Sequence, residues 1–270
     1  MRILFIGDVV GRSGRTAVCR ELPRLKKRFE IDFAIVNGEN SAGGFGITEA
    51  ICQDLLDAGA DVITTGNHVW DQRETLVYID RHPQLLRPAN FPAGTPGRGS
   101  GIYESARGGR VMVINIMGRV FMDPLDCPFQ ALERELSEGG LKSKADAIIV
   151  DLHAEATAEK QTIGHFADGR VTAVLGTHTH VPTADEHILP GGTAYMTDVG
   201  MCGDFQGVIG MRKEEPLQRM QSKIPNARFE PSLGTATICG VMIDVDIQSG
   251  LATRIEPLRM GGALREVAPD

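Results

Sequence analysis

Short apolar runs alternate with amphipathic stretches through the first third of the chain. Residues 3–6, 33–36 and 62–65 are continuous apolar runs, whereas 15–29 and 48–58 place their apolar residues at helical spacing. Continuous apolar strands that alternate with helices are typical of parallel sheets covered on both faces. The pattern therefore predicts three parallel strands connected by two helices.

The pattern changes after residue 85, where prolines and glycines as far as Gly101 predict a long ordered loop. Further strands are predicted at 111–116, 147–152, 171–175 and 194–197, and antiparallel strands at 237–246 and 252–257. Residues 215–229 are predicted to be helical as far as Pro225. A turn is predicted at 11–14, and the last ten residues are expected to form a loose tail. We expect an α/β fold, a mixed sheet or two packed sheets flanked by helices, in a single domain over residues 1–270.

Composition narrows the class of protein. With 270 residues, 42% of them hydrophobic, the chain can bury a large core, and a net charge of −7 gives no electrostatic footprint for duplex nucleic acid. The five cysteines are scattered without a CxxC pair, which argues against a disulfide framework or a thiolate zinc site. No apolar run approaches the roughly 18 residues of a membrane span, and no signal peptide is evident. We expect a soluble, cytoplasmic protein with no membrane partner.

Polar side chains follow five of the predicted strands. They are Asp8, Glu39 and Asn40, Asn67 and His68, His153, and the pair His178 and His180. Each motif alone has a structural alternative, such as a helix N-cap for Asp8, a turn for Glu39–Asn40 or a hydrogen-bonded structural role for His153. The His-x-His pair is a good bidentate arrangement for a transition metal.

Taken together, these residues predict a metal centre at the carboxyl edge of a sheet, where open α/β sheets place their sites. The donors are too many for one tetrahedral zinc and suit two ions that share a bridging carboxylate. Mixed oxygen and imidazole ligands favour iron, manganese or zinc over magnesium or calcium. The glycines of residues 7–14 have the wrong spacing for a dinucleotide fingerprint, and no Gly-Lys-Ser/Thr ending supports a P-loop. The other histidines, His82, His165 and His187, read as surface or structural residues.

The order of these motifs resembles the calcineurin-like metallophosphoesterase superfamily and, more closely, the YmdB-like bacterial phosphodiesterases. The superfamily pattern of a strand-end Asp, a second acid, Gly-Asn-His, a lone His and Gly-x-His-x-His spans most of the chain, and the YmdB-like subgroup is further indicated by residues 38–40, 118–122 and 197–201. Two positions depart from the superfamily. Val10 stands where the superfamily usually has a histidine, so one imidazole is missing. Glu39, followed by Asn40, stands where the superfamily usually has Asp. We expect Asn40 to take the place of the missing imidazole.

The resemblance implies a four-layer fold of two packed mixed sheets with helices outside, and hydrolysis of 2′,3′- and 3′,5′-cyclic nucleotides. It also implies two ions, with iron expected ahead of manganese or zinc. Glu39 would bridge them; Asp8, Asn40 and His180 would complete one site, and Asn67, His153 and His178 the other.

The expected mechanism has a hydroxide between the two ions as nucleophile and His68 as the proton donor to the leaving ribose oxygen. Two alternatives stay open: a metal-binding nucleotide or iron sensor without turnover, and a phosphomonoesterase or nuclease on the same site. The acidic composition weighs against a long nucleic-acid substrate. The glycine-rich residues 198–211 read equally as a substrate-facing loop, a subunit contact or a plain turn system, and the sequence leaves the substrate-binding residues and self-association unassigned.

Overall fold

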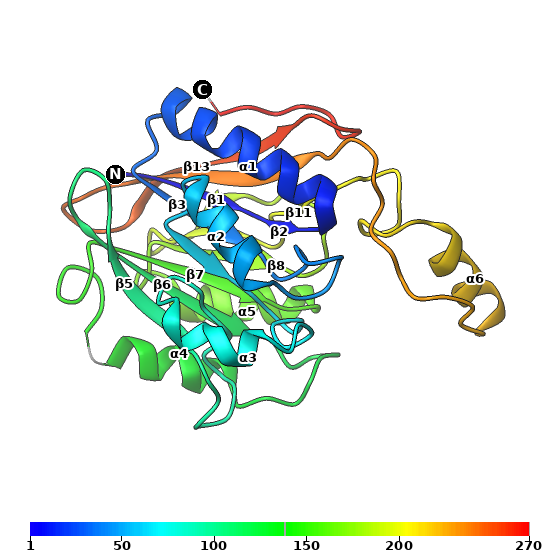
Figure 1. Ribbon diagram of the computed structural model, residues 1–270. Helices are drawn as coiled ribbons and strands as arrows, with labels where there is room; N and C mark the ends of the chain where they lie inside the picture. Colours follow the sequence, from blue (N-terminus) through cyan, green and yellow to red (C-terminus); the bar gives the residue numbers. More distant parts are fainter. Residues whose placement is uncertain (138, 270) are drawn as a thin grey trace.

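The computed structural model describes residues 1–137 and 139–269, and two large β-sheets pack against each other within it (Figure 1). The five-stranded sheet has the order β13-β12-β1-β3-β4, with β1 (Arg2–Ile6), β3 (Phe33–Asn37) and β4 (Val62–Thr64) parallel and with β12 (Ile238–Val245) and β13 (Ala252–Met260) in antiparallel pairs. Its three parallel strands are the ones that the apolar runs predicted.

The second sheet has six strands in the order β5-β6-β7-β8-β10-β9. Its parallel strands are β6 (Arg110–Met117), β7 (Ala147–His153), β8 (Ala173–Thr177) and β10 (Ala194–Met196), and its antiparallel edges are β5 (Ser100–Glu104) and β9 (His187–Ile188). A short parallel pair, β2 (Asp8–Val9) with β11 (Met201–Cys202), continues from the end of β1. Because β1, β3 and β4 share one direction, as do β6, β7 and β8, each sheet gathers several strand carboxyl ends at one edge.

Alternation along β1 shows why its apolar run is continuous. Ile3 and Phe5 pack into the core between the two sheets, whereas Leu4 and Ile6 face the helix-covered side. Both sets are almost completely inaccessible to solvent, as expected for a strand with a covered layer on each face.

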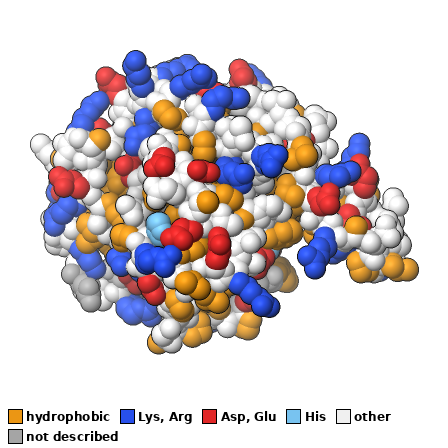
Figure 2. Space-filling view, viewed as in Figure 1, with side chains coloured by type: hydrophobic (Ala, Val, Ile, Leu, Met, Phe, Trp, Pro, Cys, Tyr) orange, Lys and Arg blue, Asp and Glu red, His pale blue; other side chains and the backbone are white. Residues whose placement is uncertain are grey.

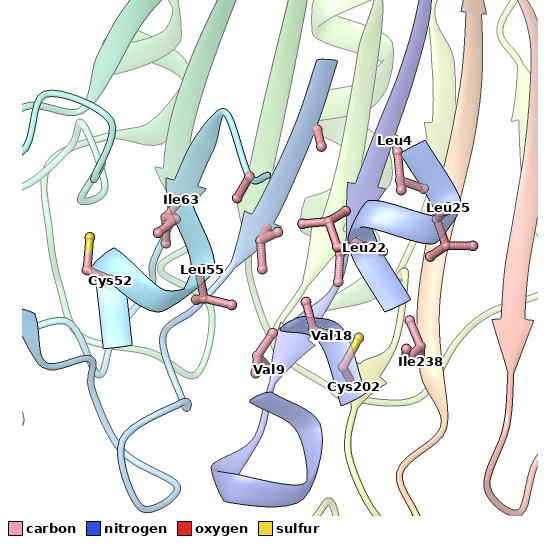
Figure 3. Close-up of a cluster of buried hydrophobic side chains, with 14 of the residues drawn as sticks. Leu4, Val9, Val18, Leu22, Leu25, Cys52, Leu55, Ile63, Cys202 and Ile238 are labelled. Atoms are coloured by element: carbon pink, nitrogen blue, oxygen red, sulfur yellow. The ribbon is translucent and has the colours of Figure 1, made fainter. Parts of the chain in front are cut away.

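Helices cover the outer face of each sheet. Figure 3 shows side chains of α1 (Gly11–Arg28) and α2 (Glu49–Asp57) packed with Leu4 and Ile63 of the five-stranded sheet. On the other side α4 (Pro128–Ser137) and α5 (Thr157–Ala167) pack on the six-stranded sheet. The remaining helices are the short α3 (Thr75–Tyr78), the 3₁₀ turn η1 (Ile79–Arg81) and α6 (Glu214–Ser222). The arrangement is therefore helix, sheet, sheet, helix.

The predicted turn at residues 11–14 is wrong, since α1 begins at Gly11 with Val10 as its N-cap. The glycines serve close packing instead: a Cβ at Gly14 would lie 2.0 Å from the carbonyl oxygen of Cys202. Asp8 is consequently not the N-cap of this helix. The C-terminal tail is also less loose than expected, because Val267 exchanges two backbone hydrogen bonds with Arg259.

The helix predicted at residues 215–229 is present as α6 and ends at Ser222, before Pro225. It belongs to an excursion, residues 204–236, that we call the α6 segment; the segment stands apart from the sheets (Figure 1). Backbone bonds of 3.0 and 2.9 Å between Gly203 and Thr237 close its base. No helix among the described residues is long and apolar enough to cross a bilayer.

Candidate metal centre

The carboxyl ends of five strands bring the predicted ligands to one place. Asp8 follows β1, Glu39 and Asn40 follow β3, Asn67 and His68 follow β4, His153 ends β7, and His178 and His180 follow β8. Contacts cross between the sheets: the Nε2 atom of His153 lies 2.9 Å from Oδ1 of Asn67 and 3.0 Å from Oε1 of Glu39. Gly66 permits this approach, because a Cβ there would lie 2.3 Å from the same Nε2 atom.

Two clusters of potential ligands share the carboxylate of Glu39. One contains Glu39, His153 and His178, and the other contains Asp8, Glu39 and His180; within each, the ligand atoms lie within 4.8 Å of one another. Glu39, Asp8 and His153 are fully buried. A carboxylate common to two adjacent clusters is the arrangement that a bridging ligand requires.

The charges in this pocket perturb one another. Burial raises the pKa of Asp8 to about 6, although His180 and His153 lower it. Burial would also raise the pKa of Glu39, but the attraction of His153 and its neighbours outweighs burial and brings the pKa to about 2. Burial would lower the pKa of His153, but the attraction of Glu39 outweighs burial and raises this pKa to about 9. The pKa of His178 is lowered to about 3 by burial and by the nearby charge of His153. Strongly coupled shifts of this kind are typical of functional sites.

One buried acceptor in the pocket lacks a partner. Oδ1 of Asp8 has no hydrogen-bond donor within reach in the described part of the chain, while Oδ2 accepts from the backbone N–H of His178 at 3.3 Å. An orphaned carboxylate oxygen is costly without a cation or a donor. The donor set and this free oxygen therefore fit a bound metal ion.

A buried chain of hydrogen bonds holds the ring of His153. Its Nδ1 atom lies 2.9 Å from the Thr177 hydroxyl, which donates to Asp151 at 2.7 Å, and Asp151 in turn accepts from Asn37 at 3.0 Å. In the neutral ring that metal binding requires, Nδ1 as donor leaves the lone pair of Nε2 to face the cluster. The sequence reading did not assign these supporting residues. The signal for one of them was present, because Asp151 is a carboxylate inside an otherwise apolar strand.

The loop that carries the His-x-His pair has a strained backbone and is held by hydrogen bonds to a buried carboxylate. His178 and His180 have φ angles of 98° and 68°, in the left-handed region that costs non-glycine residues of order 1–3 kcal/mol. The carboxylate of Asp198 accepts from the backbone and hydroxyl of Thr179 at 3.1 and 2.7 Å. Asp198 is itself paired with the buried ammonium of Lys160 at 2.7 Å. This ion pair fixes the loop.

His68 occupies a different position from the clustered histidines. Its backbone N–H donates to Glu39 at 3.2 Å, and its Nδ1 atom lies 2.8 Å from the carboxylate of Asp71. The ring lines a cavity of about 660 Å³ beside the two clusters. His68 thus faces the space above the ligands, and Asp71, which the sequence reading did not assign, orients it.

Asn40 lies with the second cluster, where its Nδ2 atom is 3.1 Å from both Oε1 of Glu39 and Nε2 of His180. To serve as a metal ligand its carboxamide must turn so that Oδ1 takes the place of Nδ2. Among the remaining histidines, His82 hydrogen-bonds to Glu49 and His187 to the backbone of Asp185, in keeping with structural roles.

Similarity to known proteins extends over nearly the whole chain. The family model described as YmdB-like protein matches residues 4–258. The chain belongs to the YmdB-like family. Within it, the 2′,3′-cyclic-nucleotide 2′-phosphodiesterase of Bacillus subtilis is 50% identical over 256 residues, which cover 95% of this chain and 96% of that protein. A putative phosphatase/phosphodiesterase of Mycoplasma pneumoniae is 36% identical, covering 96% and 93%.

Solved structures of similar proteins share the fold. A hypothetical protein from Thermus thermophilus superimposes with a TM-score of 0.90 at 41% identity, covering 97% of this chain and all of that one. A structure described as a novel phosphatase from Mycoplasma pneumoniae gives a TM-score of 0.88 at 35% identity, covering 97% and 93%. The predicted fold class, two packed mixed sheets flanked by helices as in the metallophosphoesterases, is confirmed.

Proposed function

We propose that this YmdB-like chain is a phosphodiesterase with a binuclear metal centre that hydrolyses cyclic nucleotides, of the 2′,3′ type and of the 3′,5′ type. The observation that carries the proposal is the carboxylate of Glu39, which belongs to both ligand clusters. The B. subtilis relative, named for 2′,3′-cyclic nucleotides, supports the substrate class at 50% identity.

The ligand sets follow from the clusters and the resemblance. Glu39 would serve both ions; Asp8, Asn40 and His180 would complete one site, and Asn67, His153 and His178 the other. Mixed oxygen and imidazole donors favour iron, manganese or zinc. When bound, the two ions neutralise the phosphate charge and lower the pKa of water, which supplies the nucleophile.

The protein itself supplies the proton for the leaving group. Hydrolysis forms one P–O bond to the oxygen of water and breaks the P–O bond to a ribose oxygen, which must leave protonated. His68 lies beside the ligands but outside both clusters and lines the cavity; because Nδ1 contacts Asp71, the proton to be donated would be the one on Nε2 of the imidazolium form. General acid catalysis of this kind contributes about 10²–10⁴ in rate.

The test pairs metal analysis with turnover. Metal content and hydrolysis of bis-p-nitrophenyl phosphate, 2′,3′-cyclic AMP and 3′,5′-cyclic AMP are measured on the wild type and on His68→Ala. We expect about two ions per chain in both proteins and a fall in hydrolysis of about 10²-fold or more in the variant. His165→Ala, an exposed histidine of α5, is the matched control and should behave as wild type.

Each contrary outcome removes a defined part of the proposal. Two ions with no hydrolysis of any substrate would favour a metal-binding sensor, and a single ion would exclude the bridge. Full turnover in His68→Ala would remove the proton donor while leaving the metal centre. Hydrolysis of only one type of cyclic nucleotide would restrict the substrate class to that ring.

A further inference from the structure

The cavity beside the metal centre has two chemically different ends. The ligand end is formed by the strand-end loops and includes Glu39, Asn40, His68, His178 and His180. The other end is largely apolar and comes mainly from the α6 segment, with Val208, Ile209, Met211, Pro216, Met220 and Phe229 beside the cations Arg219 and Lys223. At about 660 Å³ the cavity is within the size range of small-molecule sites and far larger than a phosphate group requires.

Two aromatic rings lie in this cavity. Phe229 lines the α6 end, and the guanidinium of Arg219 stands 4.1 Å from the centroid of its ring. Phe45 also lines the cavity, with its ring edge-on to that of His68 at a centroid distance of 5.1 Å. Apolar walls with aromatic faces, next to a site for phosphate, suit a planar aromatic group attached to a phosphate.

A hydrogen bond ties the two ends of the cavity together. Nδ1 of His180 lies 2.9 Å from the carbonyl oxygen of Ile209, so that a candidate ligand contacts the backbone of the α6 segment. Of the three interpretations left open for residues 198–211, a substrate-facing loop agrees best with this contact and with the cavity-lining positions of Val208 and Met211. Figure 2 shows the segment standing off from the body, with hydrophobic, basic and acidic side chains on its surface.

We propose that the α6 segment forms the nucleobase subsite of the enzyme, with the base of a cyclic nucleotide stacked against Phe229 while its phosphate occupies the ligand end. This inference rests on the proposed phosphodiesterase function. It assigns binding of the base to a segment that includes part of residues 198–211, whose role the sequence left open.

The partners of the polar side chains around this subsite indicate how a base would be recognised. Arg219 is held by Glu215 at 2.7 Å and by the carbonyl oxygen of Ala227 at 2.6 Å; Thr179 is held by Asp198, and Glu155 lies 3.2 Å from Nε2 of His178. These three groups are already engaged, and Lys223, the other cation of this lining, is exposed to solvent, so we assign base binding mainly to stacking rather than to hydrogen bonds with the base edge. Stacking on aromatic rings is tolerant of base identity. Cyclic phosphates of adenosine and uridine should therefore differ in kcat/KM by no more than on the order of tenfold.

The decisive experiment compares two substrates that differ only in the base. Adenosine 2′,3′-cyclic phosphate and methyl riboside 2′,3′-cyclic phosphate share the same cyclic diester. For the wild type we expect kcat/KM to be about tenfold or more higher with the base present. In Phe229→Leu, which keeps an apolar side chain but removes the ring, KM for the adenosine substrate should rise by about tenfold, and the values for methyl riboside should stay unchanged. Phe229→Tyr, which keeps a ring, should retain the wild-type preference.

Phe166→Leu is the matched control, because Phe166 on α5 also carries an arginine over its ring, Arg170 at 5.2 Å, but does not line the cavity. It should behave as wild type. Equal kcat/KM for the two substrates in the wild type, or an equal loss on both in Phe229→Leu, would overturn the base subsite while leaving the phosphodiesterase function intact. Absence of turnover on both substrates, in a protein that binds its metal ions, would overturn the proposed function and this inference with it.

Discussion

The metal centre and the α6 segment are built in opposite ways. The centre lies where strands from two sheets end, and Asp8, Glu39 and His153 are fully buried there. The α6 segment leaves the body at Gly203 and returns at Thr237, and hydrophobic side chains such as that of Met220, 76% exposed, stand in solvent. A sheet edge fixes ligand positions to within the tolerance that metal coordination needs, whereas the outer part of the α6 segment, beyond the contact of Ile209 with His180, can vary without moving them. The contrast implies that metal binding and substrate preference respond to different substitutions.

The largest expected effect is at the ligand shared by both clusters. Glu39→Gln removes the carboxylate charge from both ion sites at once, so that metal content should fall below two ions per chain and hydrolysis should fall by on the order of 10³-fold or more. Metal analysis and steady-state kinetics measure both quantities. Glu104→Gln, on the exposed surface of β5, is the control. Retention of two ions by Glu39→Gln would show that Glu39 does not bridge them.

The next effect comes from the hydrogen bonds behind His153. Thr177→Val preserves the shape of the side chain but removes the hydroxyl that links Nδ1 of His153 to Asp151. Loss of such an orienting group typically weakens metal binding by about 10–100-fold. Competition with a chelator measures this affinity, with Thr162→Val on α5 as the control. An unchanged affinity would mean that packing alone orients the ring.

A smaller effect is expected from the carboxylate that orients His68. Asp71→Asn weakens the hold on Nδ1 while the proton donor itself remains, so kcat should fall by about tenfold, a fraction of the total attributed to the general acid. Metal content should be unchanged. Asp57→Asn in α2 serves as control. Loss of metal in Asp71→Asn would place Asp71 in the ligand network.

The smallest effect is expected on the outer surface of the α6 segment. Leu217 is half exposed and does not line the cavity. Leu217→Ser should therefore leave metal content and turnover as in wild type and change the free energy of unfolding by no more than about 0.5 kcal/mol. Thermal unfolding and the assays above measure this. A fall in Tm of several degrees would show that this surface packs against something in solution.

The strands could be predicted from the sequence wherever both of their faces are covered. The continuous apolar runs at β1, β3 and β4 predicted these strands to within one residue at each end, because burial on both sides leaves no polar alternation. The error at residues 11–14 has the opposite origin. Glycines usually indicate turns, but Gly14 is required here by the carbonyl of Cys202, a residue so distant along the chain that no local pattern contains the contact.

For the candidate site, the sequence identified the residues that gather at the strand ends, and their role as ligands stays a prediction until metal is measured. It did not identify the groups that hold them. Thr177 reads as one hydroxyl among several in its loop, and only the neighbouring strand shows that it connects His153 to Asp151. Likewise, residues 198–211 carry glycines whose use depends on the cavity that they border. The contacts that support a ligand depend on its tertiary neighbours and cannot be predicted from the sequence, whereas the residue type alone indicates whether a side chain can bind a metal.

If His180 binds an ion, as we propose, its hydrogen bond to the carbonyl of Ile209 makes ion binding and the order of the α6 segment linked equilibria. A ligand imidazole held in one orientation by an ion holds that carbonyl in one place, and by thermodynamic reciprocity a segment fixed by its substrate raises the affinity for the ion. Removal of the metal should consequently increase hydrogen exchange in residues 208–211. Bound metal would then also order the segment that lines the substrate pocket.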